Sequence, residues 1–148
     1  MDIALAQPDD KVDILHVADR QLGAGYLDPQ LLCELLDSSG GFTLVAKRDA
    51  RVVGFAMCLI VDANEARRMT RTEVPKYLGH ADRIGIVKTV AVSPDSAGMG
   101  IGTDLVRACL NRFRDGGVRA GLTGSTIDVI RLRAAAEGRE VDDLDLDY

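Results

Sequence analysis

The stretch from Ile84 to Leu110, IGIVKTVAVSPDSAGMGIGTDLVRACL, combines three structural signals in one continuous segment. Its first part, residues 84–92, is rich in β-branched residues and is typical of a buried strand. Residues 93–96, SPDS, end that strand, and alternating glycines then lead into a helical pattern. A strand, a glycine loop and a helix N-terminus together favour an anion site, because free N–H groups and the helix dipole both attract negative charge.

The glycine spacing excludes two common nucleotide loops. Glycines stand at Gly98, Gly100 and Gly102, and Thr103 follows at once, so the Lys that completes a Walker loop is absent. The dinucleotide fingerprint places two residues between its second and third glycines, whereas one residue separates them here. The helix that follows repeats apolar residues on one face: Ile101, Leu105, Cys109 and Phe113.

Composition predicts one soluble globular domain over residues 1–148. The chain is 47% hydrophobic and 28% charged, and its net charge is −5, which argues against nucleic acid as a partner. No apolar run approaches membrane-spanning length, and the N-terminus has no signal-peptide pattern. We therefore expect a cytoplasmic protein with no membrane partner.

The three cysteines, Cys33, Cys58 and Cys109, are scattered in apolar surroundings and predict free buried thiols in a reducing compartment. Only two histidines occur, His16 and His80, and no Cys/His cluster accompanies them, so no metal site is expected. His16 lies among the apolar residues of a predicted helix, which favours a structural role for it.

The remaining elements alternate strands and helices. Asp28 and Pro29 are typical of a helix start, as N-cap and first helical residue. Gly54, inside a strand, indicates a bulge or a close backbone approach. The full set begins with a strand at 3–6, helices at 11–22 and 29–36, a hairpin of strands at 42–46 and 51–61, and a polar loop at 62–82 with a short helix near 74–78. It continues with a strand at 118–123, a helix beginning at 125 or 126, and residues 141–148, which are either a last strand or a solvated acidic tail. Because a hairpin and βα units are mixed, we expect an α/β protein of mixed α+β type rather than a doubly wound one.

The central segment resembles the acetyl-CoA-binding motif of the GNAT (Gcn5-related) N-acetyltransferases. That motif consists of a Val-x-Val strand end, a proline and Arg/Gln-x-x-Gly-x-Gly/Ala opening a helix, and residues 90–94 and 97–105 are similar to it. Residues 52–56, VVGFA, resemble the family's third strand. The resemblance implies a central, mostly antiparallel, splayed sheet flanked by helices.

The resemblance also implies a ligand and a reaction. Loop N–H groups would bind the pyrophosphate of acetyl-CoA, and the strand backbone would pair with its pantetheine arm. A backbone N–H would polarise the thioester carbonyl while an amine of a small molecule or a protein attacks it directly. The implied coenzyme-binding residues are Val90, Ala91, Val92, Ala97, Gly98, Met99, Gly100, Ile101, Gly102 and Thr103.

Three positions depart from the family pattern. Ala97 stands where the loop normally begins with Arg or Gln, and the region 124–133 lacks the family's Tyr acid. Only about ten residues follow that region's helix, enough for one of the two expected closing strands, so a strand from a partner chain in a homodimer is one alternative.

The catalytic residues stay open at this stage. The central strand has no Glu, and Lys88 is the charged residue between Ile84 and Val92. Candidates for the base are Glu65, Glu73 and His80 in the polar loop, and Tyr148 is a candidate acid. Water alone is an alternative base, and a non-catalytic acyl-CoA-binding or regulatory module is the alternative function.

Overall fold

The computed structural model describes residues 1–38, 40–69, 83–116 and 120–122. Most of the predicted elements in these ranges are confirmed, including the Asp28 cap, whose carboxylate accepts from Gln30 N at 2.9 Å. The elements are β1 (Asp2–Leu5), a 3-10 turn η1 (Pro8–Asp10), α1 (Lys11–Leu22), α2 (Pro29–Glu34), β2 (Asp37–Ser38), β3 (Gly41–Arg48), β4 (Arg51–Asp62), α3 (Ala63–Met69), β5 (Arg83–Val92), η2 (Pro94–Ser96), α4 (Ile101–Asp115) and β6 (Ala120–Leu122).

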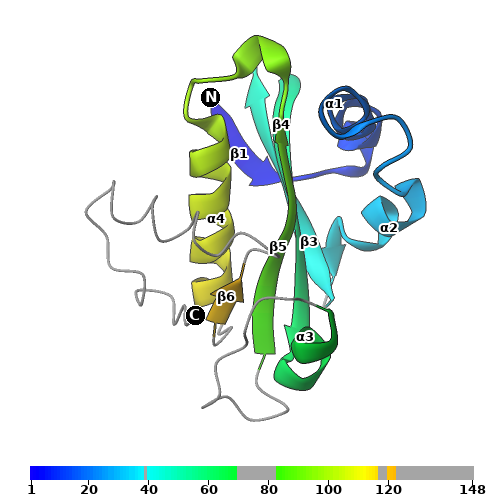
Figure 1. The fold of residues 1–148 in the computed structure, drawn as a ribbon. Coiled ribbons are helices and arrows are strands. Elements are labelled where there is room, and N and C mark those ends of the chain that lie inside the picture. The colour runs from blue at the N-terminus through cyan, green and yellow to red at the C-terminus, as the bar shows by residue number, and fades with distance from the viewer. Residues whose placement is uncertain (39, 70–82, 117–119, 123–148) are drawn as a thin grey trace.

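These strands form one open sheet with helices on both faces (Figure 1). The strand order is β1-β3-β4-β5-β6, and β2 pairs with the start of β3. Neighbouring strands are antiparallel except β5 and β6, which are parallel. Helix α4 covers one face, while α1 and α2 cover the other. The predicted mixed class and mostly antiparallel central sheet are confirmed.

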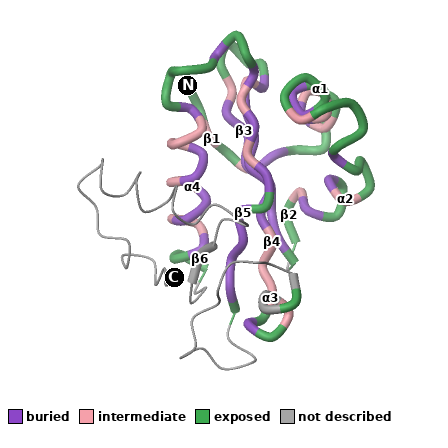
Figure 2. The backbone as a smooth tube through the Cα atoms, viewed as in Figure 1, coloured by how far each residue is buried: buried purple, intermediate pink, exposed green. Residues whose placement is uncertain are grey.

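Each face of the sheet carries its own apolar cluster, because successive strand residues point to opposite sides. On one side the predicted face of α4, with Leu105 and Phe113 fully buried, packs on Phe42 and Leu44 of β3. On the other, Ile14 of α1 and residues of α2 pack on Phe55 and Met57 of β4. Figure 2 shows the buried backbone running through the strands and along α4.

Asp10 fixes the start of α1 to the sheet. One carboxylate oxygen accepts from Gln7 N at 2.8 Å, and the other lies 2.8 Å from Nζ of Lys47 on β3. Burial raises the pKa of Asp10, but these two partners lower it more, so its pKa lies below the usual value. The same hydrogen bond raises the pKa of Lys47.

The structure corrects the polar loop predicted for 62–82. Residues 63–69 are helix α3, and Asp62 accepts from Glu65 N at 2.7 Å, which satisfies a free donor at the helix start. This short helix has few apolar residues, so it carries no periodic signal in the sequence. The short helix predicted near 74–78 lies outside the described residues, as do the helix beginning at 125 or 126 and the acidic tail.

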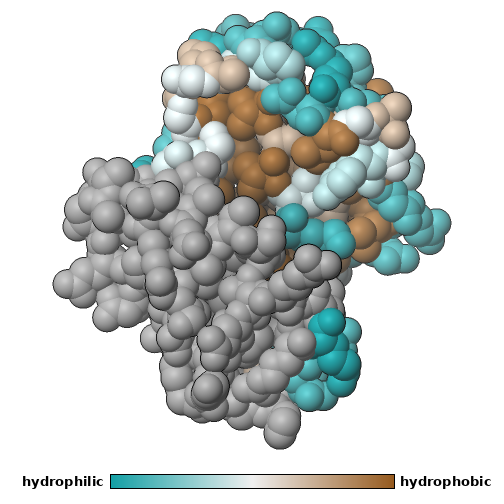
Figure 3. Space-filling view, in the orientation of Figure 1, coloured by the Kyte–Doolittle hydropathy of each residue, from teal (hydrophilic) through white to brown (hydrophobic). Residues whose placement is uncertain are grey.

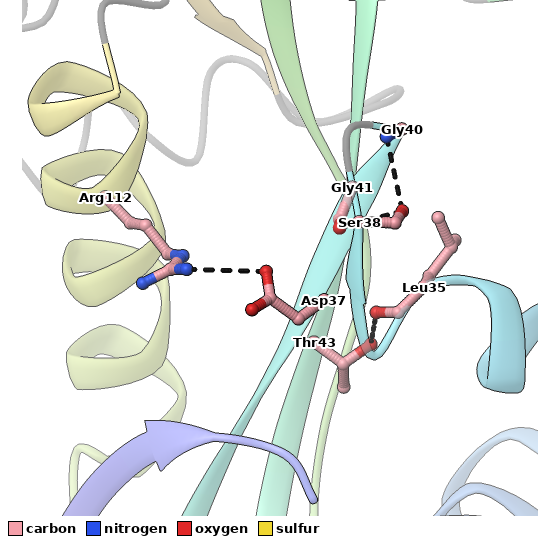
Figure 4. Close-up of polar contacts among 7 residues, drawn as sticks. All are labelled: Leu35, Asp37, Ser38, Gly40, Gly41, Thr43 and Arg112. Carbon is pink, nitrogen blue, oxygen red and sulfur yellow. Dashed lines mark hydrogen bonds and ion pairs between the residues drawn. The ribbon is translucent and has the colours of Figure 1, made fainter.

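A short strand, β2, follows α2 where the sequence predicted only a helix end. Thr43 Oγ1 donates to Leu35 O at 2.8 Å, which ties the end of α2 to β3 (Figure 4). Asp37 Oδ1 lies 3.7 Å from Arg112 Nη2, and that guanidinium also lies 5.0 Å from the ring centroid of Phe42. These contacts fix the C-terminal half of α4 against the β2–β3 corner.

Two smaller predictions are wrong. Cys33 is exposed, because it lies on the outer side of α2, whereas Cys58 and Cys109 are buried as predicted. In α1 the buried face is Ile14, Val17 and Ala18, so His16 is on the exposed side and not among buried apolar residues. Within the described residues, no helix has the length and apolar character needed to cross a membrane.

Candidate functional site

The glycine loop between β5 and α4 takes a left-handed backbone at two positions. Gly98 and Gly100 both have φ of 78°, and a Cβ built on either would meet no atom within 4 Å. Glycine is therefore needed at both positions for conformation rather than for space inside the protein. A Cβ on Gly102 would make an ordinary contact, 3.7 Å from Val92 Cγ2.

This loop presents a run of free backbone donors. The first helical bond of α4 runs from Asp104 N to Gly100 O at 3.0 Å, and no side chain caps the helix. Within the described part of the chain, none of the N–H groups of residues 98–103 has an acceptor. Free donors at the positive end of a 15-residue helix form an anion-binding surface.

The backbone of β5 beside the loop is open on one edge. Ser93 N donates to Val53 O at 2.7 Å, so these residues form a hydrogen-bonded pair between β5 and β4. In an antiparallel ladder, alternate residues bond to the neighbouring strand. Ala91 therefore also bonds to β4, whereas Val90 and Val92 direct their N–H and C=O groups away from β4. These groups face the edge that a further strand would occupy.

The strand β6 does not reach that edge. Its described residues, Ala120–Leu122, pair with Ile84, Gly85 and Ile86, at the far end of β5. A bulge separates the β6-paired end of β5 from the end at Val90–Val92. Thr89 pairs with Met57 but Val87 pairs with Cys58, which leaves Lys88 as an extra, bulged residue. Among the described elements, the sheet therefore ends at β5 from the bulge to the glycine loop.

A glycine on β4 brings α4 close to this region. A Cβ on Gly54 would lie 3.1 Å from Ala91 O and 3.2 Å from Leu105 Cδ1. Next to it, Val53 is unpaired where the β3–β4 register shifts between Ala46 and Lys47. Of the two alternatives predicted for Gly54, the close approach is confirmed, while the bulge lies at the neighbouring Val53. These features place the start of α4 against β4 and β5.

A cavity of about 310 Å³ joins the open edge to the loop. Its lining is mostly backbone and apolar side chains, with the amide of one Gln and one Ser: Gln21, Leu22, Val90, Ala91, Val92, Ser96, Ala97, Gly98, Gly100, Ile101 and Gly102. Gln21 Nε2 donates to Val92 O at 2.6 Å, so that carbonyl is occupied, while the other edge groups of Val90 and Val92 have no partner in the part of the chain that the structure describes. In the part of the surface that Figure 3 colours, apolar residues lie together within a hydrophilic rim.

The structure brings together most of the residues predicted to bind coenzyme. Val90 to Val92, Ala97 and the three loop glycines line the same cavity as Ile101. Met99 projects outward at 51% exposure, and Thr103 is half-buried in the first turn of α4. Their roles stay predictions, but their positions form one continuous surface.

Of the predicted catalytic residues, the structure describes Glu65, which is not brought to this cavity. Glu65 lies on α3 and forms an ion pair with Arg68. Helix α3 follows the end of β4 that pairs with Arg83, at the opposite end of β5 from the loop. A ten-residue strand spans about 30 Å. Glu73, His80 and Tyr148 lie outside the described residues.

Gln21 is a site residue that the sequence did not indicate. It is exposed on the last turn of α1, and only the three-dimensional contact with Val92 relates it to the cavity. A single Gln on a helix carries no sequence signal for such a contact. No group of His, Cys, Asp or Glu that could hold a metal ion occurs in the described residues.

A second cavity, of about 400 Å³, lies at the other end of the sheet. Its cations already have partners: Arg112 contacts Asp37 and Phe42, and Arg83 is also engaged. The glycine-loop cavity differs because its polar groups are free backbone donors. We therefore take the glycine loop as the candidate site.

Comparison with known proteins agrees with this geometry. No match was found among curated proteins. A transcriptional regulator from Bacillus halodurans C-125 has 18% identity and a TM-score of 0.66, covering 99% of this chain and 97% of that one. An aminoglycoside N-acetyltransferase, AAC(6')-Iy, in complex with CoA has 17% identity and a TM-score of 0.66 over 94% of this chain and 87% of that one.

A third structure, the ribosomal-protein-alanine N-acetyltransferase from Brucella melitensis biovar Abortus 2308, has 17% identity and a TM-score of 0.64, covering 97% of this chain and 94% of that one. At these identities the structural matches establish the fold. The sequence model described as the acetyltransferase (GNAT) family matches residues 12–133, which is most of the chain. The protein therefore belongs to the GNAT acetyltransferase family.

Proposed function

We propose that this protein is an acyl-CoA-dependent N-acetyltransferase that transfers an acetyl group from acetyl-CoA to an amine of a small molecule or a protein. The observation that carries the proposal is the run of free N–H groups at residues 98–103 beside the open edge of β5. Family membership supports the same reading, as does the fold shared with a neighbour that was solved with CoA.

The donor set of the cavity fits this coenzyme. Free N–H groups at the start of α4 suit a pyrophosphate, which needs several donors and positive potential. The free N–H and C=O of Val90 and the free N–H of Val92 suit the amides of a pantetheine arm, as if a further strand were added. The apolar lining between them, including Leu22 and Ile101, suits its alkyl groups.

When bound, acetyl-CoA supplies an acetyl group activated as a thioester. The chain contributes position and polarity: the loop holds the phosphates, and the edge of β5 holds the arm. A backbone N–H near the bulge at Lys88 would donate to the acetyl carbonyl oxygen and stabilise the negative charge that develops there. The amine nitrogen then forms the new C–N bond as the C–S bond breaks, and CoA leaves as the thiol.

No titratable side chain lines the cavity among the described residues. The proton of the attacking amine therefore goes to water or to a residue outside the described ranges. Glu73, His80 and Tyr148 remain the candidates there, and each is testable by replacement with Gln, Asn and Phe respectively. If one of them is the general base or acid, its replacement should lower kcat by about 10²-fold or more with little change in acetyl-CoA affinity.

Calorimetric titration with acetyl-CoA tests the proposal directly. Gly100→Asp places a carboxylate among the loop donors and is expected to abolish binding. Gly25→Asp is the matched control, because Gly25 has the same φ of 78° and open surroundings but lies in the α1–α2 loop. No binding by the wild-type protein at millimolar acetyl-CoA, or equal binding by both variants, would refute the proposal.

A non-catalytic acyl-CoA-binding module is the second candidate. The observation in its favour is the absence of titratable groups from the described lining of the cavity. A panel of amines with acetyl-CoA distinguishes the two functions. CoA release should be followed by chromatography, since exposed Cys33 would itself react with thiol reagents. Amine-dependent release of CoA supports the enzyme, and tight binding without release supports the module.

A further inference from the structure

We propose that Arg48 and Arg51, at the tip of the β3–β4 hairpin, bind a phosphate group of the coenzyme beside the glycine loop. They would supply the positive charge that the loop lacks at Ala97. This inference rests on the proposed function and assigns part of its binding site to a segment outside the glycine loop.

The hairpin tip carries an unfavourable charge pair and a strained turn when no ligand is bound. Arg48 and Arg51 are direct cross-strand partners, so two like charges face each other. The two residues between them, Asp49 and Ala50, have φ of 53° and 64°, a left-handed turn that strongly favours glycine or asparagine at these positions. An anion bound between the guanidinium groups would convert their repulsion into attraction.

Arg48 already lies against the loop. Its Nη1 is 3.3 Å from Sδ of Met99, the residue between Gly98 and Gly100. A thioether is a weak acceptor, so this contact leaves the donors of a permanently charged guanidinium largely unused. Within the described residues, neither Arg48 nor Arg51 forms an ion pair.

A cavity of about 320 Å³ lies between the hairpin tip, α1 and the start of the loop, and both arginines line it. Ser96 lines this cavity and the glycine-loop cavity, so the two adjoin. Three carboxylates also line it, and one of them, Asp95, pairs with Arg20 at 3.8 Å. Arg48 is the cation that contacts the loop itself, and its planar fork suits a phosphate.

Titration of acetyl-CoA into Arg48→Gln and Arg51→Gln tests the inference. Arg114→Gln is the matched control, because it removes the same charge from an exposed residue near the other end of α4. We expect Kd to rise on the order of tenfold for Arg48→Gln, several-fold for Arg51→Gln and less than about twofold for the control. The Kd of Arg48→Lys should lie between those of wild type and Arg48→Gln, because lysine keeps the charge but lacks the planar, two-pronged donor geometry of arginine.

The phosphate involved is identified with two shorter ligands. If Arg48 binds the 3′-phosphate, the difference between wild type and Arg48→Gln disappears with acetyl-dephospho-CoA. If it binds the pyrophosphate, the difference persists with that ligand and disappears with acetylpantetheine. Either pattern supports the inference.

Equal affinities of Arg48→Gln, Arg51→Gln and Arg114→Gln for acetyl-CoA would overturn it, while leaving the proposed function intact. Failure of the wild-type protein to bind acetyl-CoA would instead overturn the proposed function. Thermal unfolding without ligand separates folding defects from binding, because removal of one of two facing like charges should leave Tm unchanged or raise it.

Discussion

A methyl group added to Gly85 of β5 should strongly destabilise the fold, because it would enter the ring of Phe113. A Cβ built on Gly85 lies 2.5 Å from two ring atoms and 2.6 Å from a third. Carbon atoms in contact are normally about 3.5–4.0 Å apart, so the ring or α4 must move by about 1 Å. Phe113 is only 2% exposed and packs edge-on against Phe42 at 5.4 Å, which leaves the ring little room.

The magnitude follows from that overlap. Overpacking a tight core costs about 1–3 kcal/mol, and overlap with three atoms of one ring places this change at the upper end. Replacing a strand glycine offsets about 0.5–1 kcal/mol of that cost. We expect Gly85→Ala to lower the free energy of unfolding by about 2 kcal/mol, or Tm by about 4–8 °C for a chain of this size. Urea denaturation measures this change, provided that the dependence of the free energy of unfolding on urea concentration is the same in both proteins. Gly40→Ala is the control, since its nearest contact is an ordinary 3.8 Å from Ser38 Oγ.

A double-mutant cycle of Gly85→Ala with Phe113→Leu tests whether the ring of Phe113 is the obstacle. Phe113→Leu alone should cost about 1–2 kcal/mol through lost packing. In the Phe113→Leu background, Gly85→Ala should cost less than about 0.5 kcal/mol, so the two changes couple by about 1.5 kcal/mol. Additive effects would show that the ring is not the obstacle. Acetyl-CoA affinity of the folded Gly85→Ala protein should be unchanged, because Gly85 pairs with β6 at the far end of the strand.

Three further predictions concern charge, thiols and the loop. Asp10→Asn should destabilise the protein by about 1 kcal/mol at pH 7 by removing a capping carboxylate. The pKa of Asp10 is depressed in the folded protein. The difference in free energy of unfolding between wild type and Asp10→Asn should therefore be complete above the unfolded-state pKa of about 4 and disappear as pH falls through the lower folded-state pKa. Urea denaturation curves at several pH values would check this. A thiol reagent should modify one cysteine, exposed Cys33, in the native protein and all three only after unfolding, since burial also raises the pKa of Cys58; rapid native reaction of more than one thiol would contradict the buried assignment. Ala97→Arg should lower the Kd for acetyl-CoA by about three- to tenfold by calorimetry, because it adds a further guanidinium beside the loop donors, and an unchanged Kd would contradict a phosphate bound at this end of the loop.

Strong periodicity made the central part of the fold predictable. The β-branched run of β5, the apolar face of α4 with Leu105 and Phe113, and the strands of the hairpin were all expected from the sequence and are present. Helix α3 and strand β2 were missed because each is short and held by individual hydrogen bonds, such as the one from Glu65 N to Asp62. Such bonds leave no repeating pattern.

Part of the candidate site carries a local signal in the sequence. The loop glycines carry a local signal, and the family resemblance explained them. The contacts made by Gln21 and Arg48 join segments 71 and 51 residues apart in the chain. A pairing over that distance has no local signature, so it could be found only from the folded structure.

The open edge of β5 also bears on solubility. A strand edge with free N–H and C=O groups is a template on which another chain can add a strand, and proteins usually protect such edges with charge, bulges or covering elements. Here the bulge at Lys88 and the side chain of Gln21 protect part of that edge, while the backbone of Val90 has no partner among the described residues. A pantetheine arm bound there would complete the protection. The coenzyme would then act as a guard against self-association as well as a substrate, and the ligand-free protein would be the form most prone to aggregate.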